Sequence, residues 1–221
     1  MTPRCQPLST PPTPQRGVAL VVVLLILLVV IVLGVGGAQI ALLSERTARY
    51  DRDYLIASQA AEAALMDAEF DIRGEVFKDP ANETLGVLPT ARSAKFDQTD
   101  SGIFATGCSN QDPTRGLCLP NADTAKPVWA EIDFRGDSTS ASPRSVEYGT
   151  FTGRTFDAGS GIRPVHSPRY VIELIDDRTP GANAALGKGA KMYRITALGF
   201  GPREDVQVVM QTVFRKEKSR P

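Results

Sequence analysis

Histidine is almost missing from this sequence: the 221 residues contain one, His166, between Pro164 and Pro168 in a predicted loop. A zinc cluster built on histidines needs more than one, and a Ser–His–Asp triad would depend on this single residue. An excess of charge is also missing, because 25 basic residues balance 25 acidic ones. We therefore nominate no catalytic residue, no metal ligand and no cofactor, and we expect no direct binding of nucleic acid.

Cysteine is scarce, with Cys5, Cys108 and Cys118 as the full set, and none lies in a CxxC motif. If the region around Cys108 and Cys118 is exported, an oxidising compartment favours a disulfide between them. Closing so short a loop stabilises the fold by roughly 2–3 kcal/mol on the chain-entropy model. Two free buried thiols are the alternative.

Charge is entirely absent from Gly17 to Ser44. Residues 18–38 form a continuous apolar run of about 21 residues, which is enough for a helix to cross a bilayer. A buried core helix rarely runs so long without a polar face. A secretory signal has a shorter apolar part of about 7–15 residues and a small-residue cleavage site, which Gly36, Gly37 and Ala38 would have to supply. We interpret residues 18–38 as a retained transmembrane helix.

The orientation of this span follows from the flanking charges. Residues 1–17 contain Arg4 and Arg16 and no acidic residue, whereas charges of both signs follow the span. The positive-inside rule then predicts a cytoplasmic N-terminal segment and an exported C-terminal region.

The helical pattern continues beyond the span, over residues 39–78, which are rich in good helix formers and contain no proline. Its predicted apolar stripe is Leu43, Leu55, Ala61, Ala64, Leu65 and Ala68. Within the span, Gly34 and Ala38, like Gly37 and Ala41, are four residues apart, a spacing that lets two helices approach closely in a membrane. We expect the helix to end at Asp79-Pro80.

The remainder, residues 79–221, predicts a head domain. Residues 128–134 alternate weakly and suggest a strand. Residues 169–175, 192–200 and 206–215 predict clearer strands, the last two joined by a five-residue hairpin loop. The expected fold class is α+β, with an antiparallel sheet packed on the C-terminal half of the long helix.

Three short motifs in this region are weaker. Arg135-Gly136-Asp137 is an integrin-type tripeptide that occurs often by chance. Residues 181–189 resemble a phosphate loop, but the glycine spacing is wrong and Gly189 replaces the required hydroxyl residue. Asp176-Asp177 lacks the spacing of an EF-hand, and we interpret it as a solvated strand end.

Two blocks carry a family resemblance. Residues 15–20, Gln-Arg-Gly-Val-Ala-Leu, resemble the leader signal of type IV prepilins, a short basic leader that ends in glycine before an apolar helix. Residues 44–49 and 58–65 are similar to the N-terminal region of the PilX family of pilus-assembly proteins, and residues 193–201 and 208–214 to its last strand pair. The resemblance covers roughly residues 15–70 and 191–215, and the middle matches nothing.

The resemblance implies processing by prepilin peptidase. The cut would follow Gly17, with Arg16 as the basic leader residue, and Val18 would become the methylated N-terminus. The protein would then lie in the bacterial inner membrane with a periplasmic head, and later in the pilus. Its partners would be other pilin subunits, which pack against the helix around Gly34, Gly37 and Ala38.

One departure from the family pattern concerns Val22, the fifth residue after the expected cut. Most pilins have a glutamate there, which pairs with the N-terminal amine of a neighbouring subunit. A carboxylate in a bilayer costs roughly 2.5–3.5 kcal/mol on insertion scales. A subunit without it suggests a non-standard position, such as the pilus tip or an initiation complex.

The functional hypothesis is therefore a minor pilin in type IV pilus assembly, with indirect roles in twitching motility or adhesion. One alternative is a minor pseudopilin of a type II secretion system, which shares the layout and includes subunits without the glutamate. A second alternative is a signal-anchored periplasmic enzyme, which predicts an uncut leader and a catalytic cluster in the head.

Overall fold

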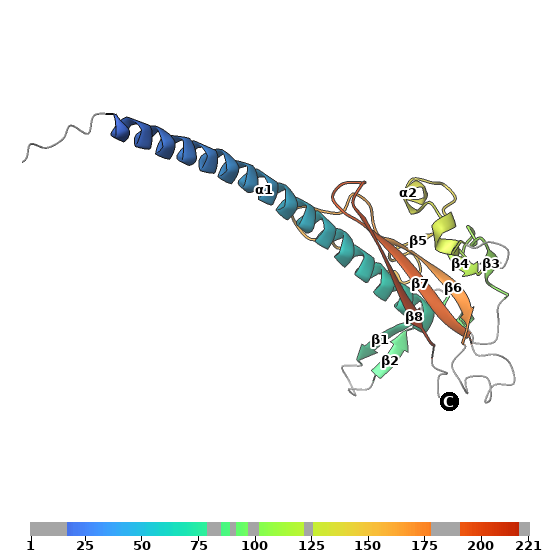
Figure 1. The fold of residues 1–221 in the computed structure, drawn as a ribbon. Helices are drawn as coiled ribbons and strands as arrows, with labels where there is room; N and C mark the ends of the chain where they lie inside the picture. The colour runs from blue at the N-terminus through green and yellow to red at the C-terminus, as the bar shows by residue number, and fades with distance from the viewer. Residues whose placement is uncertain are drawn as a thin grey trace, which may run out of the picture. The chain divides into compact units, whose positions relative to one another are not determined.

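The computed structural model describes residues 17–78, 85–88, 92–96, 102–121, 126–177 and 191–216. The chain divides into two compact units, the first ending at Arg49 and the second beginning at Tyr50. A long helix and a sheet of several strands make the fold α+β, as the sequence predicts (Figure 1).

The long helix, α1, spans Val18–Arg73. It ends at Arg73, so the predicted helix over residues 39–78 is too long at its C-terminal end. Gly74 has a positive φ of 90° and donates its N–H to the carbonyl of Phe70 at 2.7 Å. Glycine adopts this left-handed conformation without the strain of a side chain and so ends the helix. The next residues form β1, Glu75–Lys78, which pairs antiparallel with β2, Leu85–Leu88.

Three long strands form the centre of the main sheet: β6, Arg169–Asp176; β7, Lys191–Phe200; and β8, Gln207–Phe214. β6 pairs antiparallel with β7, and β7 with β8. The hairpin closes where Gly201 N–H donates to the Val206 carbonyl at 2.8 Å. These strands confirm the three that the alternating apolar pattern predicts.

The sheet is mixed rather than purely antiparallel. Its order is β3-β4-β6-β7-β8, with β3, Ala105–Thr106, parallel to β4, Leu117–Leu119, and β4 parallel to β6. β5, Val146–Glu147, adds an antiparallel pair to β6. The parallel strands are only two or three residues long, too short to leave a period-2 pattern in the sequence.

The predicted strand over residues 128–134 is wrong. Val128–Glu131 is a 3-10 helix, η2, and Phe134–Asp137 is a short helix, α2. Asp133 caps α2 by accepting the Gly136 N–H at 2.9 Å. Val128 and Ile132 are both buried, and their spacing of four residues fits helical turns as well as weak alternation fits a strand. A further 3-10 helix, η1, spans Ser93–Lys95.

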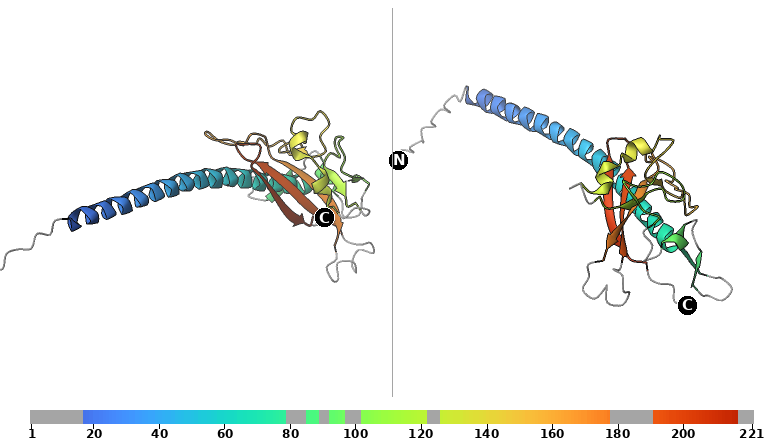
Figure 2. Two further views of the ribbon diagram at one scale, coloured as in Figure 1. Left: turned by 45° about the horizontal axis from the view of Figure 1, so that its top comes forward. Right: turned by 90° about the vertical axis from the view of Figure 1, so that its right-hand side faces the viewer.

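The C-terminal turns of α1 cover one face of the sheet (Figure 2). The buried positions of the helix are Asp53, Ala57, Ala60, Ala61, Ala64, Asp67, Ala68, Asp71 and Ile72. The alanines let helix and sheet come close: a Cβ on Gly199 of β7 would lie 2.0 Å from the carbonyl oxygen of Ala57. The predicted stripe is correct at its alanines, whereas Leu43 and Leu55 are exposed.

The other face of the sheet is covered by the segment between β3 and β5. Its cluster of buried residues is Cys108, Cys118, Val128, Ile132, Phe134, Val171, Leu198 and Phe200. The head therefore has three layers, with helix, sheet and loop segment stacked in that order.

Candidate assembly interface

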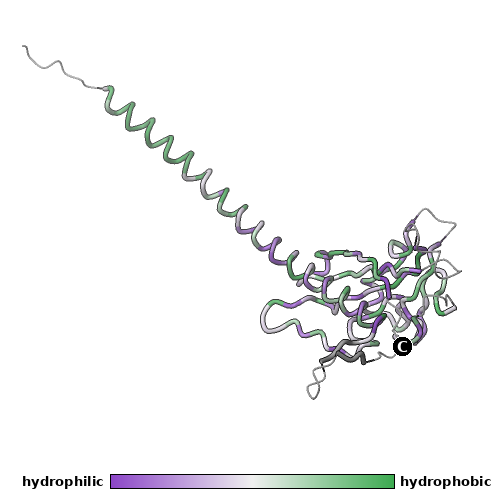
Figure 3. The backbone as a smooth tube through the Cα atoms, turned by 90° about the horizontal axis from the view of Figure 1, so that it is seen from below, coloured by the Kyte–Doolittle hydropathy of each residue, from purple (hydrophilic) through white to green (hydrophobic). Residues whose placement is uncertain are grey.

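The first unit presents an apolar surface around one helix. Large apolar residues of α1 from Val18 to Leu43 keep between 46% and 73% of their surface exposed. Figure 3 shows the first turns of α1 as uniformly hydrophobic, with paler and more hydrophilic turns further along the helix. A helix that is apolar all round needs lipid or other helices against it. By length and composition, α1 is also able to cross a membrane.

The sequence-predicted processing and packing residues lie along this helix. Gly17 has a φ of 129° and directly precedes α1, which begins at Val18. Val22 is exposed. Arg16 lies outside the described residues.

The small residues of the helix leave its surface open. A Cβ on Gly34 or Gly37 would meet no atom within 4 Å, and Ala38 is exposed. Nothing in the described chain fills the space beside these positions, and backbone contact with a second helix is sterically open there.

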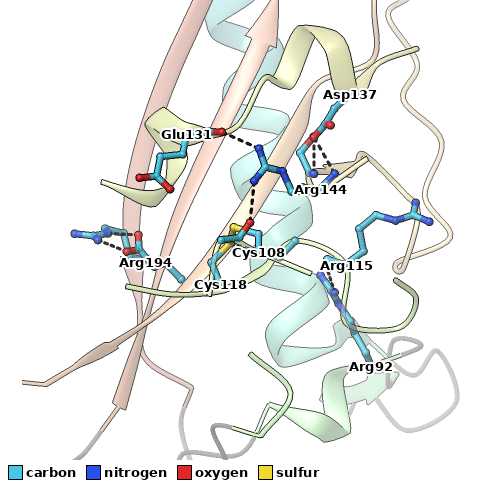
Figure 4. The surroundings of a disulfide bond; sticks show 12 residues. Arg92, Cys108, Arg115, Cys118, Glu131, Asp137, Arg144 and Arg194 are labelled. Carbon is cyan, nitrogen blue, oxygen red and sulfur yellow. Dashed lines mark hydrogen bonds and ion pairs between the residues drawn. A yellow bond between two sulfur atoms is a disulfide. The ribbon is translucent and has the colours of Figure 1, made fainter. Parts of the chain in front are cut away.

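A disulfide joins Cys108 and Cys118 in the head (Figure 4). It links the end of β3 to β4, and so fixes the short parallel strands beside β6. Cys118 is fully buried. The bond closes the short loop between Cys108 and Cys118 that the sequence analysis considered. The structure therefore contains the disulfide and not two free thiols.

Arg144 ties this disulfide loop to the segment that covers it. Its guanidinium donates to the carbonyl of Gly107 at 3.3 Å and to that of Glu131 at 2.8 Å. Asp137 accepts the N–H groups of Arg144, at 3.1 Å, and of Ser145, at 2.7 Å (Figure 4). The carboxylate of the Arg-Gly-Asp tripeptide thus holds the fold together.

The other end of that tripeptide is also engaged, because Arg135 pairs with Glu204 of the β7–β8 hairpin. His166 lies 3.8 Å from the same carboxylate and against the ring of Phe200. Through these contacts, Arg135 of α2 and the loop that contains His166 are held against the β7–β8 hairpin.

A buried ion pair joins the end of α1 to the rest of the head. Arg92 donates from Nε to both carboxylate oxygens of Asp71 at 2.9 Å, and both side chains are fully buried. Arg92 also donates to the carbonyl of Arg115 at 2.6 Å and lies over the Phe151 ring at 3.8 Å. Tyr170 of β6 donates its hydroxyl to Asp71 at 2.9 Å.

The electrostatics of this cluster follow from burial. Complete burial, and then the negative charge of Asp71, raises the pKa of Tyr170 well above 10.0. One helical turn earlier, burial raises the pKa of Asp67, although its carboxylate accepts the Gly149 N–H at 2.8 Å and the Thr152 hydroxyl at 2.5 Å. Both residues hold α1 to the sheet and its loops.

Sequence reasoning missed these acids. Asp53, Asp67 and Asp71 lie at the helical spacing of the buried alanines, and so on the same face of α1. This shared face was the sequence signal that could have indicated their burial. Asp177 was also misjudged: it is buried and pairs with Arg215, whereas the solvated strand end is its neighbour Asp176. The phosphate-loop-like residues 181–189 lie outside the described residues.

Within the described ranges, no group of three or more His, Cys, Asp or Glu side chains is arranged to hold a metal ion.

Comparison with protein families assigns the chain. The family model for the C-terminal domain of type IV pilus assembly protein PilX matches residues 103–216, more than half of the chain. The PilX N-terminal model matches residues 16–65. The chain belongs to the PilX family of type IV pilus assembly proteins. No curated protein and no solved structure matches it.

The two PilX matches cover different parts of the fold. The N-terminal match contains the apolar part of α1 and the alanine-rich turns that pack on the sheet. The C-terminal match contains the disulfide, β3 to β8 and the hairpin. It includes residues 103–190, for which the sequence alone showed no resemblance. The fold, a long apolar helix followed by a sheet, is pilin-like.

Proposed function

We propose that this PilX family member is a minor pilin. It is made with the leader 1–17, enters the bacterial inner membrane through the apolar part of α1, and is cut after Gly17 by prepilin peptidase. The same helix then packs against the helices of other pilin subunits in a type IV pilus. The observation that carries the proposal is the exposed apolar surface of α1, which is dense from Val18 to Val35 and continues at Ile40, Leu42 and Leu43.

Physical chemistry supports both states of this helix. In the bilayer its backbone polar groups are satisfied internally, and its side chains face lipid. In a fibre the same side chains bury against other helices, and apolar burial contributes about 25 cal/mol per Å² relative to water.

Topology fits the same proposal. Arg4 and Arg16 favour a cytoplasmic leader, which puts Cys108 and Cys118 in the oxidising periplasm.

Residence in the pilus is the direct test. The wild-type protein is expected in pili sheared from cells, whereas Gly17→Val, which puts a branched side chain at the cleavage site, is expected to stay in the membrane fraction. Gly36→Val is the matched control inside the helix and leaves cleavage unchanged. Absence of the wild-type chain from sheared pili, together with loss of enzyme export when it is deleted, would instead favour the secretion pseudopilin.

The position in the fibre follows from Val22. Without a carboxylate at this depth the subunit cannot pair with the terminal amine of a neighbour, and we place it at the tip or in the initiation complex. Val22→Glu restores the carboxylate and is expected to raise the amount of the protein along the fibre, with Val23→Glu as the control on the next helix position. Equal incorporation of wild type and Val22→Glu at every expression level contradicts this placement.

A further inference from the structure

β8 forms one end of the main sheet (Figure 1). Among the strands that the structure describes, it pairs with β7 and with no other. Its sequence, Gln-Val-Val-Met-Gln-Thr-Val-Phe, contains no charged residue and no proline. Natural edge strands are usually protected by a charge, a proline, a bulge or a cover, and within the described residues no further strand pairs with the outer edge of β8.

The backbone geometry tells which residues would bind that strand. In an antiparallel pair, successive residues direct their N–H and C=O groups alternately toward and away from the partner strand. The carbonyl of Val206 accepts the Gly201 N–H and so points toward β7. Every second residue after Val206 therefore also directs its backbone groups toward β7. The backbone groups that point away from β7 therefore belong to Gln207, Val209, Gln211 and Val213. Their side chains are exposed as well, Val209 to 41% and Val213 to 53%.

We propose that β8 pairs antiparallel with the β8 of a second copy of this chain, about a two-fold axis at Met210. Gln207 then lies opposite Val213 of the second copy, and Val209 lies opposite Gln211. All four outward-facing residues are used in each copy, which gives about eight main-chain hydrogen bonds. Strand addition of this kind draws its affinity from the main chain, and a two-fold axis makes the surface its own partner.

The charges at the two ends of β8 select this arrangement. Acidic Glu204 and Asp205 precede the strand, and basic Arg215 and Lys216 follow it. With the axis at Met210, the turn that contains Glu204 and Asp205 comes beside Arg215 and Lys216 of the second copy. Cross-strand pairs of opposite charge stabilise a sheet and like charges destabilise it.

Other arrangements lose this match. A parallel pair would place Arg215 beside Arg215. An antiparallel pair with its axis moved one residue to Val209 would place Arg203 opposite Arg215, again a like-charged pair. Only the axis at Met210 aligns acids with bases at both ends of the strand.

Two of the charged residues at these ends already have partners in their own copy: Glu204 pairs with Arg135, and Lys216 donates to the Ser93 carbonyl at 2.5 Å. Asp205 and Arg215 are more than half exposed and carry the charge match. Asp205 is 69% exposed in its side chain and shares only an exposed pair with Arg203 at 3.6 Å; such pairs contribute little. The Arg215 side chain is 52% exposed. Although Arg215 binds Asp177, a guanidinium carries five N–H donors and can bind a second carboxylate.

Disulfide trapping tests the axis directly, in the full-length chain in detergent-solubilised membranes with Cys5 replaced by serine. Met210 faces its own copy across the axis at a Cα–Cα distance of about 4.5 Å, within the range of a disulfide. Thr212 lies about 14 Å from its counterpart, which is four residues along the strand and one strand spacing across. Met210→Cys is expected to give at least about tenfold more covalent dimer under mild oxidation than Thr212→Cys, a control on the same strand face.

Three results would overturn the proposal. Met210→Cys that stays monomeric excludes the pairing. Equal dimer from both variants indicates a parallel or unspecific contact. Linkage of Met210→Cys to a different protein identifies another occupant of this edge.

A blocking variant gives an independent check. Proline is tolerated at an edge position whose N–H faces outward, so Val209→Pro, added to Met210→Cys, is expected to reduce the dimer by about tenfold. Val209→Lys, an exposed charge, is expected to do the same if the proline disturbs the fold. Ile162→Lys, at an exposed apolar residue outside the sheet, leaves the dimer unchanged. Undiminished dimer with Val209→Lys contradicts pairing through this edge.

The proposed β8 pairing is additional to the proposed role in the pilus, and each of the two proposals can be contradicted without the other. The trapped dimer is measured in solubilised membranes whether or not the leader is cut or a pilus is formed.

Discussion

At the scale of single residues, the cluster around Asp71 joins α1 to parts of the chain that are distant in sequence. Its partner Arg92 is 21 residues away, and Tyr170 is 99 residues away. The Asp71 carboxylate therefore accepts hydrogen bonds from Arg92, which directly precedes η1, and from Tyr170 of β6. These bonds hold the last turns of α1 against both segments. Two predictions address this cluster.

Removal of one partner from the buried pair is expected to be costly. Arg92→Leu leaves the Asp71 carboxylate without its guanidinium in a fully buried position, and the expected loss is about 3–5 kcal/mol in the free energy of unfolding. Arg135→Leu, the same change in an exposed pair with Glu204, is expected to cost less than about 1 kcal/mol. Urea-dependent proteolysis of the solubilised chain measures both, and equal losses would contradict the assigned role.

The hydroxyl of Tyr170 is expected to resist ionisation. Its pKa is raised in the folded state, so its contribution to stability is fully present below the ordinary value near 10 and is lost as pH rises toward the raised value. In an alkaline titration by ultraviolet absorbance, native wild type and Tyr170→Phe are expected to show the same number of tyrosines ionising near pH 10. In denaturant they differ by one. A difference already seen in the native proteins would show that Tyr170 is accessible.

At the scale of secondary-structure elements, two contacts decide how the head is built. One is the close approach of α1 to β7 at Gly199, and the other is the disulfide that places β4 beside β6. Each supports a prediction with a control inside the same chain.

The glycine contact leaves no room for a side chain. A Cβ at position 199 would lie 2.0 Å from the Ala57 carbonyl oxygen and 2.4 Å from the Ala61 nitrogen, both backbone atoms. Gly199→Ala is therefore expected to destabilise the head by about 1–3 kcal/mol or more, measured as a lower urea midpoint. Gly36→Ala meets no neighbouring atom and is expected to leave the midpoint of the head unchanged. An unchanged midpoint for Gly199→Ala would mean that helix and sheet are not packed this closely.

The disulfide is expected to hold the loop of residues 108–118 in place. Replacing both cysteines with serine should lower the free energy of unfolding by roughly 2–3 kcal/mol. It should also speed cleavage by trypsin after Arg115, which the closed loop protects. Cys5→Ser is the control and is expected to change neither. If the double variant is as stable and as resistant as wild type, the bond does not support β4.

The predictable elements are those with local signals. The long helix, the strands β6 to β8 and their hairpin follow from hydrophobic periodicity and from residues next to each other in sequence. The end of α1 at Arg73 was missed because the helix was continued to Asp79-Pro80, although Gly74 is a typical residue for a helix C-terminus and Val76 and Phe77 favour a strand. The segment 128–134 was misjudged because the apolar positions in Val-Trp-Ala-Glu-Ile-Asp-Phe satisfy either period.

Other features depend on distant parts of the chain. An aspartate on an alanine-rich face is ordinarily placed in solvent, and nothing near Asp71 in sequence announces Arg92. The parallel pairing of β4 likewise depends on the disulfide and on Gly116, whose carbonyl accepts the Ile172 N–H at 2.8 Å.

At the scale of the whole molecule, the chain contains two parts whose surfaces suit different surroundings. The first unit is an exposed apolar helix segment, and the second is a three-layered head with a buried polar cluster and a disulfide. The proposed function needs both in one mature chain, with the helix in lipid or packed on other helices and the head in water. It therefore requires that the helix begins the mature protein and remains attached to the head.

Intact mass analysis of the protein extracted from membranes shows where the mature chain begins. We expect a mature chain that begins at Val18, carries one N-terminal methyl group, and contains the oxidised Cys108–Cys118 pair. A chain that still begins at Met1, or one that begins near Ala38 after loss of the apolar segment, would contradict the proposed function.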